Sequence, residues 1–159
     1  MDDGEVPRAL SEAELDTVAA TIDAWAARQL AENDAVAAVE RGEPGERRWY
    51  VRVKGEAKDV FTIWFTLRQR TLAYETYFLP APEENHTEVY EYALRRNANL
   101  YGAAFAIGEE DALFLVGQCP AGVVTEAELD RILGSLYAWV ERHFRALLHL
   151  AFASRFQQS

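Results

Sequence analysis

Residues 60–67, VFTIWFTL, are the stretch that decides the fold. Every second side chain from Phe61 to Leu67 is large and apolar. The alternate positions hold Val60, Thr62, Trp64 and Thr66. Successive side chains of a β-strand point to opposite faces of its sheet, so this strand has one apolar face and one uncharged face. We therefore predict a central strand of a sheet, with helices packed against one face.

Further strand patterns flank this segment. RWYVRVKG at 48–55 alternates apolar and polar residues, and TLAYETYFL at 71–79 follows after the short turn RQR. AAFAIG at 103–108 and ALFLVGQ at 112–118 are joined by EED, which is typical of a hairpin. The turn sequences GEPGE and GEAKD contain the residue types that hairpin turns favour. The sequence thus predicts a five-stranded, mostly antiparallel sheet.

The sequence predicts three helices with the same type of start signal, one of which begins at Asn85 with Glu88 three residues later. SEAE at 11–14 and TEAE at 125–128 each place a capping hydroxyl residue three positions before a glutamate. Apolar residues then recur with the helical period as far as Glu32 in the first helix and Ala151 in the last. At 1.5 Å per residue the last helix is about 40 Å long.

The stretch NHTEVYEYALRRNANLYG, residues 85–102, predicts a helix between the third and fourth strands. Asn85 is its expected N-cap and Gly102 its expected stop. Its expected apolar stripe is Val89, Tyr90, Ala93, Leu94 and Leu100. The resulting order is α-β-β-β-α-β-β-α, an α+β fold with one sheet and three helices.

We predict one domain over residues 10–153, with a disordered acidic tail at 1–9 and a fraying C-terminus at 154–159. The last helix ends in LLHLAF, which is apolar nearly all round. Such a helix end requires burial on several sides, so we expect a subunit contact there. The predicted contact residues are Leu147, Leu148 and Phe152.

Composition limits the classes of partner. The chain has 159 residues, a formal net charge of −10 and a pI of about 4.8, so its surface repels nucleic acid and anionic lipid. The N-terminus lacks the apolar stretch of a signal peptide, and no run of eighteen apolar residues predicts a membrane span. The one cysteine, Cys119, suits a reducing cytoplasm. We expect a cytoplasmic protein without nucleic-acid or membrane partners.

No motif in the sequence predicts catalysis, a metal or a cofactor. His143 and His149 are six positions apart on one helix and cannot share an ion, and no cysteine pair exists. Cys119 ends a strand beside Pro120, which favours a small apolar filler over a nucleophile. The paired carboxylates gather at helix starts and a hairpin tip, where they have structural explanations. The prediction is that the protein is not an enzyme.

Four segments together resemble the YbjN family, in particular its actinobacterial branch. They are YVRVKGE, PEENHTEVYEYALRRNANLYGAAFAIG, LFLVGQ and TEAELDRILGSLYAWVERHFRALLHLAF, and they cover most of residues 49–152. The resemblance implies a fold like that of type III secretion chaperones and a homodimer. The family is described as a sensory transduction regulator or chaperone-like domain, and the resemblance carries no catalytic residues.

The favoured function is a non-catalytic protein-interaction, chaperone-like or regulatory domain that forms a homodimer. The alternative is a sensor of a small molecule or peptide, with a pocket between the sheet and the second helix. The expected lining of that pocket is Trp64, Tyr90 and Arg96. Arg96 either pairs with an acid across the sheet or receives an anion with His86 and Arg95 nearby. The sequence names no partner, ligand or pathway.

Aromatic residues are frequent on the predicted strands. Trp49, Trp64, Tyr74 and Tyr77 cannot all reach one side of the sheet. Helices are expected to cover one face and to leave the other partly aromatic. A monomer rarely leaves such a patch open, so three readings follow: a partner surface, a dimer surface, or core beneath loops.

Overall fold

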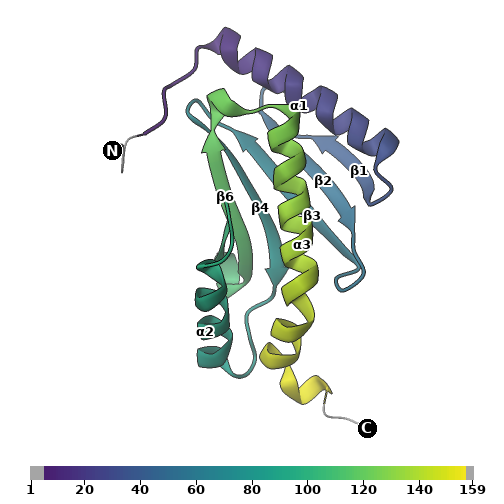
Figure 1. Ribbon diagram of the computed structural model, residues 1–159, viewed down its shortest axis with the longest axis vertical. Helices are drawn as coiled ribbons and strands as arrows, with labels where there is room; N and C mark the ends of the chain where they lie inside the picture. Colours follow the sequence, from purple (N-terminus) through teal and green to yellow (C-terminus); the bar gives the residue numbers. More distant parts are fainter. Residues whose placement is uncertain (1–5, 157–159) are drawn as a thin grey trace.

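The computed structural model describes residues 6–156 as a six-stranded antiparallel sheet with three α-helices (Figure 1). The sheet order is β1-β2-β3-β4-β6-β5. The elements are α1 Glu12–Glu32, β1 Val36–Arg41, β2 Arg48–Lys54, β3 Val60–Leu67, β4 Thr71–Leu79, α2 His86–Asn97, β5 Ala104–Ile107, β6 Leu113–Pro120 and α3 Glu126–Ala151. Short 3-10 turns cover Glu109–Asp111, Ala121–Val123 and Ala153–Phe156.

The α+β class and the three helices are confirmed, but the five-stranded prediction is wrong because it omits β1. This edge strand contains Ala37 and Ala38, which have weak β-propensity, and a bulge interrupts its register between Val36 and Ala38. Val36 is the one buried residue of the strand. Its pairing with β2, through Val36 opposite Val53, places it in the sheet where its own sequence gives almost no signal.

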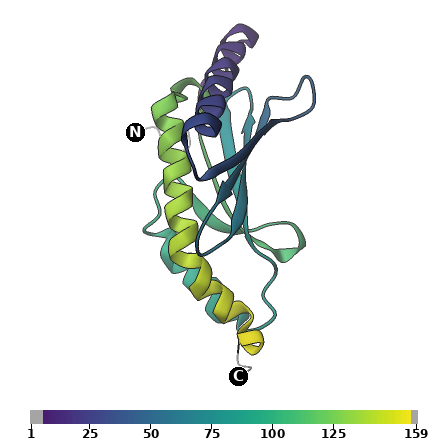
Figure 2. The same cartoon turned by 90° about the vertical axis from the view of Figure 1, so that its right-hand side faces the viewer.

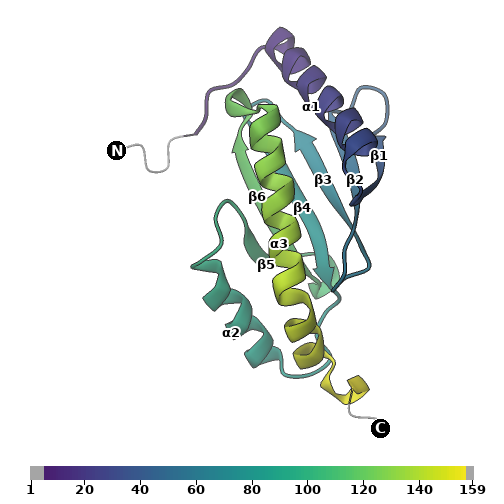
Figure 3. The same ribbon diagram turned by 45° about the vertical axis from the view of Figure 1, so that its right-hand side comes forward.

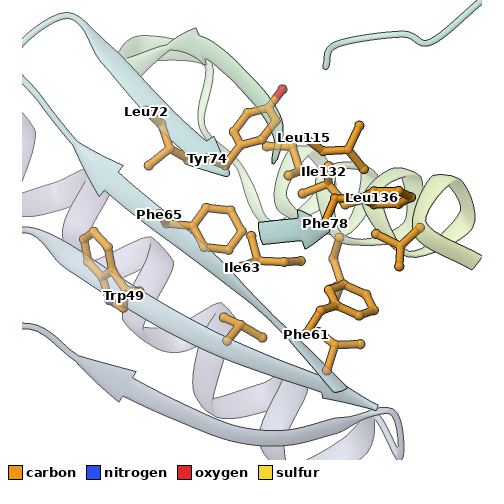
Figure 4. Packing of buried hydrophobic residues seen from close by; sticks show 14 of the residues in the cluster. Trp49, Phe61, Ile63, Phe65, Leu72, Tyr74, Phe78, Leu115, Ile132 and Leu136 are labelled. Atoms are coloured by element: carbon orange, nitrogen blue, oxygen red, sulfur yellow. The ribbon is translucent and has the colours of Figure 1, made fainter. Parts of the chain in front are cut away.

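The helices α1 and α3 lie on one face of the sheet, and α3 runs along its centre (Figures 1 and 3). The apolar side of β3 packs beneath them, as predicted, with Phe61, Ile63 and Phe65 at most 3% exposed. Figure 4 shows these rings and aliphatic side chains meeting Ile132 and Leu136 of α3. The apolar residues that recur with strand and helix periodicity therefore pack together in one core.

The capping predictions at α1 and α3 are confirmed in position. At α1 the full box forms, because the Ser11 hydroxyl accepts from the Glu14 N–H at 3.2 Å and the Ser11 N–H donates to the Glu14 carboxylate at 2.9 Å. At α3 the Thr125 hydroxyl accepts from the Glu128 N–H, while the Glu128 carboxylate binds Arg131 instead of closing the box.

Helix α2 departs from the prediction at two residues. Asn85 has a left-handed backbone, with φ of 54°, and its side chain makes no cap; the amide instead donates to the Leu150 carbonyl at 2.9 Å. Leu94 was placed on the apolar stripe but is 69% exposed. Val89 and Ala93 are the buried residues of this twelve-residue helix. The sheet edge therefore shields only a narrow stripe of α2.

The β2–β3 turn is tied to α3 by one carboxylate. Glu141 accepts backbone N–H groups from Glu56 at 2.6 Å, Ala57 at 3.0 Å and Lys58 at 3.2 Å. Desolvation raises the pKa of the Glu141 carboxyl, but these bonds and Arg145 outweigh it, and the net shift is downward. We call this contact the Glu141 clamp. It fixes the ends of β2 and β3 against α3.

The predicted terminal segments overlap the described chain only in part, since residues 1–5 and 157–159 lie outside it. The Pro7 carbonyl accepts from Arg70 at 2.7 Å. At the other end Arg155 pairs with Glu83 at 2.6 Å, and the Ser154 N–H donates to Glu84 at 2.7 Å. Within residues 6–156 no helix has the length and apolar character to cross a membrane.

Candidate binding surfaces

One face of the sheet carries no helix in the described chain, and the β5–β6 hairpin projects from this side (Figure 2). We call it the open sheet face. Strand alternation and register define its central residues. They are Arg48, Tyr50, Arg52, Lys54, Thr62, Trp64, Thr66, Glu75, Tyr77, Phe114 and Val116.

Two aromatic side chains of the open sheet face, Trp64 and Tyr77, each contact a third, Phe114. The Trp64 and Phe114 ring centroids are 6.4 Å apart, and Tyr77 meets Phe114 edge-on at 5.5 Å. Gly108 lies against the Phe114 ring so closely that a Cβ at this position would overlap it. This contact lets the hairpin fold over Phe114, which is 9% exposed, while Tyr77 remains 38% exposed.

Beside the aromatic cluster the face is hollowed. The hollow has a volume of about 530 Å³. Its lining includes Arg48, Tyr50, Trp64, Arg68 and Glu75. As predicted, the strand aromatics divide between the two faces, with Trp49 and Tyr74 buried under the helices. The hollow, which Glu109 also lines, thus combines apolar, basic and acidic side chains and remains uncovered by the described chain.

The charges of the open sheet face are unusual for this acidic chain. Of the fourteen arginines, all within residues 6–156, seven form ion pairs and two donate to backbone carbonyls. The five without such a partner in the described chain are Arg48, Arg52, Arg68, Arg96 and Arg142. The first three border the open sheet face, and the buried Nε of Arg48 has no hydrogen-bond partner there.

The other two of these five arginines, Arg96 and Arg142, line a depression between α2 and α3 that has a volume of about 390 Å³. We call it the α2–α3 pocket. It is lined by Tyr92, Arg96, Asn99, Leu100, Arg142 and His143. His143 is 5% exposed and its Nδ1 lies 2.9 Å from the Tyr92 hydroxyl. Burial, then the charges of Arg96 and Arg142, lower the pKa of His143.

The structure does not bring the three predicted pocket residues together. Trp64 lies on the open sheet face, whereas Tyr90 and Arg96 belong to α2, which packs against α3 and β5 on the opposite side (Figures 2 and 3). No acidic side chain within residues 6–156 pairs with Arg96, whose guanidinium stacks over Tyr92 at 4.6 Å, and the neighbouring Arg95 pairs with Glu91 at 3.2 Å.

Sequence reasoning missed Arg142 and Tyr92 as members of this pocket. Tyr92 and Arg96 are four residues apart and share a helix face, which is a local signal. Their meeting with Arg142 and His143 depends on how α2 docks against α3, and no local pattern carries that information.

Two of the three residues predicted as a subunit contact at the end of α3 are buried within their own chain. Leu147 is 0% exposed and Phe152 is 6% exposed, so both belong to the core of their own chain, and Leu148 is half-buried. Large exposed apolar side chains instead occur along α2, its following loop and β5. We call this region the α2–β5 edge and define it by Leu94, Tyr101 and Ile107. Their exposed fractions are 69%, 73% and 54%.

The candidate nucleophile and metal ligands remain dispersed. Cys119 is buried, and burial, followed by the Glu128 charge, raises the pKa of its thiol to about 11. His143 bonds to Tyr92, and His149 stacks on Phe156 at 4.1 Å. Within residues 6–156 no three side chains of His, Cys, Asp or Glu gather as a metal site would require.

Comparison with known proteins finds one matching family and several relatives from mycobacteria. Residues 14–149 match the YbjN family, described as "Putative bacterial sensory transduction regulator". The uncharacterized protein Rv0487 of Mycobacterium tuberculosis is 34% identical over 108 residues, which are 68% of this chain and 59% of that protein. ML2442 of Mycobacterium leprae is 30% identical over 114 residues, 72% and 62% of the two chains. The match thus spans about three-fifths of these relatives.

Two solved structures share the fold. A chain of the HopA1–SchA chaperone–effector complex superposes with a TM-score of 0.57 and 14% identity, covering 86% of this chain and 98% of that one. A chain of the ExoU–SpcU heterodimer from the type III secretion system of Pseudomonas aeruginosa gives a TM-score of 0.52 and 18% identity, with coverage of 83% and 98%. At these identities the likeness establishes a fold similar to that of type III secretion chaperones.

Proposed function

Because the chain belongs to the YbjN family, we propose that it is a non-catalytic protein-binding domain whose open sheet face holds an extended segment of a partner protein. The observation that carries this proposal is the hollow on the helix-free face of the sheet, beside an aromatic cluster in which Tyr77 is exposed. Trp64, Tyr77 and Phe114 form a cluster beside a hollow of about 530 Å³ on the face opposite the helices. Large exposed apolar surfaces on folded domains commonly mark binding sites.

The side chains of the face define the chemistry of the partner segment. The outward positions of β2 hold Arg48, Arg52 and Lys54 and no carboxylate. A guanidinium binds carboxylates in a bidentate geometry, and aromatic rings bury apolar side chains. An extended segment that alternates acidic and apolar residues matches both features. The proposal agrees with the fold, which recurs in complexes of a chaperone with its effector.

A titration with four classes of fifteen-residue peptides tests this role: acidic–apolar, basic–apolar, acidic–polar and neutral–polar. We expect the acidic–apolar class to bind most tightly, and Arg52→Glu to weaken that binding about tenfold or more because it reverses a contact charge. Arg95→Glu, on the exposed side of α2, is the matched control and should change affinity less than about twofold. Equal binding of all four classes, or equal effects of the two substitutions, would contradict the proposal.

We further propose that the protein is a homodimer and that the α2–β5 edge forms the contact. Leu94, Tyr101 and Ile107 are each more than half exposed there, and β5 is an edge strand of the sheet. Edge strands and exposed apolar residues together favour pairing with another chain. Ile107 also lines the hollow of the open sheet face, so a two-fold axis at this edge would place the second copy beside that hollow.

Size-exclusion chromatography with light scattering measures this assembly. The expected mass is about twice the 18.0 kDa of one chain. Leu94→Glu should shift the protein to the single-chain mass, because it places a charge at the centre of an apolar contact. Leu30→Glu is the matched control, since Leu30 is 50% exposed on α1. A monomeric wild type, or dissociation by both substitutions, would refute the proposed contact.

We also propose a cytoplasmic location, where the lone thiol of Cys119 stays reduced.

The sensor alternative requires a site for a small ligand. The pocket expected between sheet and second helix does not form from Trp64, Tyr90 and Arg96, so any such site must use other side chains.

A further inference from the structure

We propose that the α2–α3 pocket is a binding site for a small oxyanion, such as a phosphoryl or carboxylate group. This site is separate from the open sheet face and gives the sensor alternative side chains of its own. The two cationic residues that line it are Arg96 from α2 and Arg142 from α3, and the polar ones include Tyr92, Asn99 and His143. No aspartate or glutamate lines the pocket.

The first argument is the charge distribution. The chain contains 26 acidic and 16 basic residues, and seven of its fourteen arginines find a carboxylate. Arg96 and Arg142 have no ion pair within residues 6–156, although they converge on one depression. Two like charges brought together repel one another, and an anion between them removes that repulsion.

The second argument is preorganisation. The Arg96 guanidinium carbon lies 4.6 Å from the centre of the Tyr92 ring, so the ring supports the cation from one side. The hydroxyl of Tyr92 bonds to His143 Nδ1 at 2.9 Å, and the His143 ring is held edge-on against Phe105 at 6.0 Å. The floor of the pocket is therefore fixed by contacts within the protein, and an incoming ligand need not order it.

The third argument is access. One residue advances about 100° around a helix, so Leu94 points about 160° away from Arg96 on α2. The exposed Leu94 side chain belongs to the α2–β5 edge, whereas Arg96 faces α3. A dimer through that edge would therefore leave the pocket open to solvent. The pocket also lies on the helix side of the sheet, away from the proposed partner segment.

The ligand chemistry follows from the donors. A guanidinium has two parallel N–H groups that match the oxygens of a carboxylate or phosphate. Two guanidiniums suit a ligand with two negative charges better than a monovalent halide. Asn99 adds a side-chain amide able to donate hydrogen bonds. The shared feature of the expected ligands is thus a dianionic head with oxygen acceptors.

Isothermal titration calorimetry tests the proposal on the full chain, with inorganic phosphate and malonate as separate probes and sodium chloride at equal ionic strength as the reference. We expect saturable binding of at least one dianion and none of chloride. Tighter binding of phosphate would assign the site to phosphoryl groups, and tighter binding of malonate to carboxylates. Absence of saturable binding of both dianions would overturn the proposal.

Substitutions identify the site. Arg96→Gln and Arg142→Gln should each weaken the dianion about tenfold or more, since each removes one charge-assisted contact. Arg95→Gln, at the neighbouring exposed position, is the matched control and should leave affinity within about twofold. Without dianion, Arg96→Gln should melt at or above the wild-type temperature because it relieves repulsion from Arg142. Binding that survives both pocket substitutions, or that Arg95→Gln weakens equally, would refute the assignment.

Discussion

Replacing Glu141 by glutamine should loosen the turn that joins β2 to β3. The carboxylate accepts from three backbone N–H groups, of Glu56, Ala57 and Lys58, over distances of 2.6 to 3.2 Å. A glutamine has the same shape but only one acceptor oxygen, so its amide N–H₂ must face at least one of these donors. The strands at this turn carry the basic and aromatic residues of the open sheet face.

The expected loss follows from these bonds. Hydrogen bonds to a charged group contribute about 1.5–3 kcal/mol when buried, but Glu141 is only partly shielded from water, so we expect about 2 kcal/mol in total. For a domain of this size that corresponds to a fall in Tm of about 4–8 °C. Glu91→Gln breaks the exposed pair with Arg95 and should cost no more than about 0.5 kcal/mol.

The pH dependence identifies the carboxylate as the cause. The pKa of Glu141 is lowered in the folded protein, so the clamp stabilises fully above the unfolded-state value of about 4.3 and is lost as the pH falls below it. The free energies of unfolding of wild type and Glu141→Gln, measured with denaturant, should therefore become equal towards low pH. Equal free energies of unfolding for wild type and Glu141→Gln at pH 7 would refute the reasoning. A difference between them that persists unchanged at low pH would also refute it.

Three further changes probe the packing. Gly117→Ala should lower the free energy of unfolding by about 1–3 kcal/mol, because the new Cβ would overlap the Gly102 carbonyl oxygen; an unchanged melting temperature would contradict this close approach. Gly134→Ala should raise it by up to about 1 kcal/mol, because its Cβ enters open space on α3, and calorimetry showing a loss would disprove that. At pH 8 a thiol with a pKa of about 11 is about one part in a thousand thiolate, so Cys119 should react with a disulfide reagent far more slowly folded than in denaturant; equal rates would show an exposed thiol.

The sequence patterns that succeeded were local ones. The alternation in β3 and the Ser11 and Thr125 start signals each depend on residues within one element, and the structure places all of them as predicted. The order of helices and strands followed from these patterns, except for β1. Two adjacent alanines give that strand little intrinsic preference, and its pairing with β2 decides its conformation.

The errors and gaps concern contacts between elements. Leu94 has helical spacing from the buried stripe, but the position of the β5 edge leaves it in solvent. Leu147 lies in a segment that is apolar nearly all round, and the structure buries it within its own chain. The meeting of Arg96 with Arg142 joins residues from two helices, and their docking geometry is a property of the whole core.

The most direct test of the open sheet face is photo-cross-linking from two positions in cells that produce the protein. A photo-reactive residue replaces Thr66 on the open sheet face in one variant and the exposed Ala138 on α3 in the other. The account predicts that Thr66 cross-links to acidic–apolar segments of another protein, that Arg52→Glu abolishes these products, and that Ala138 yields none of them. Identical products from both positions, or products at Thr66 that contain only a second copy of the chain, would contradict it.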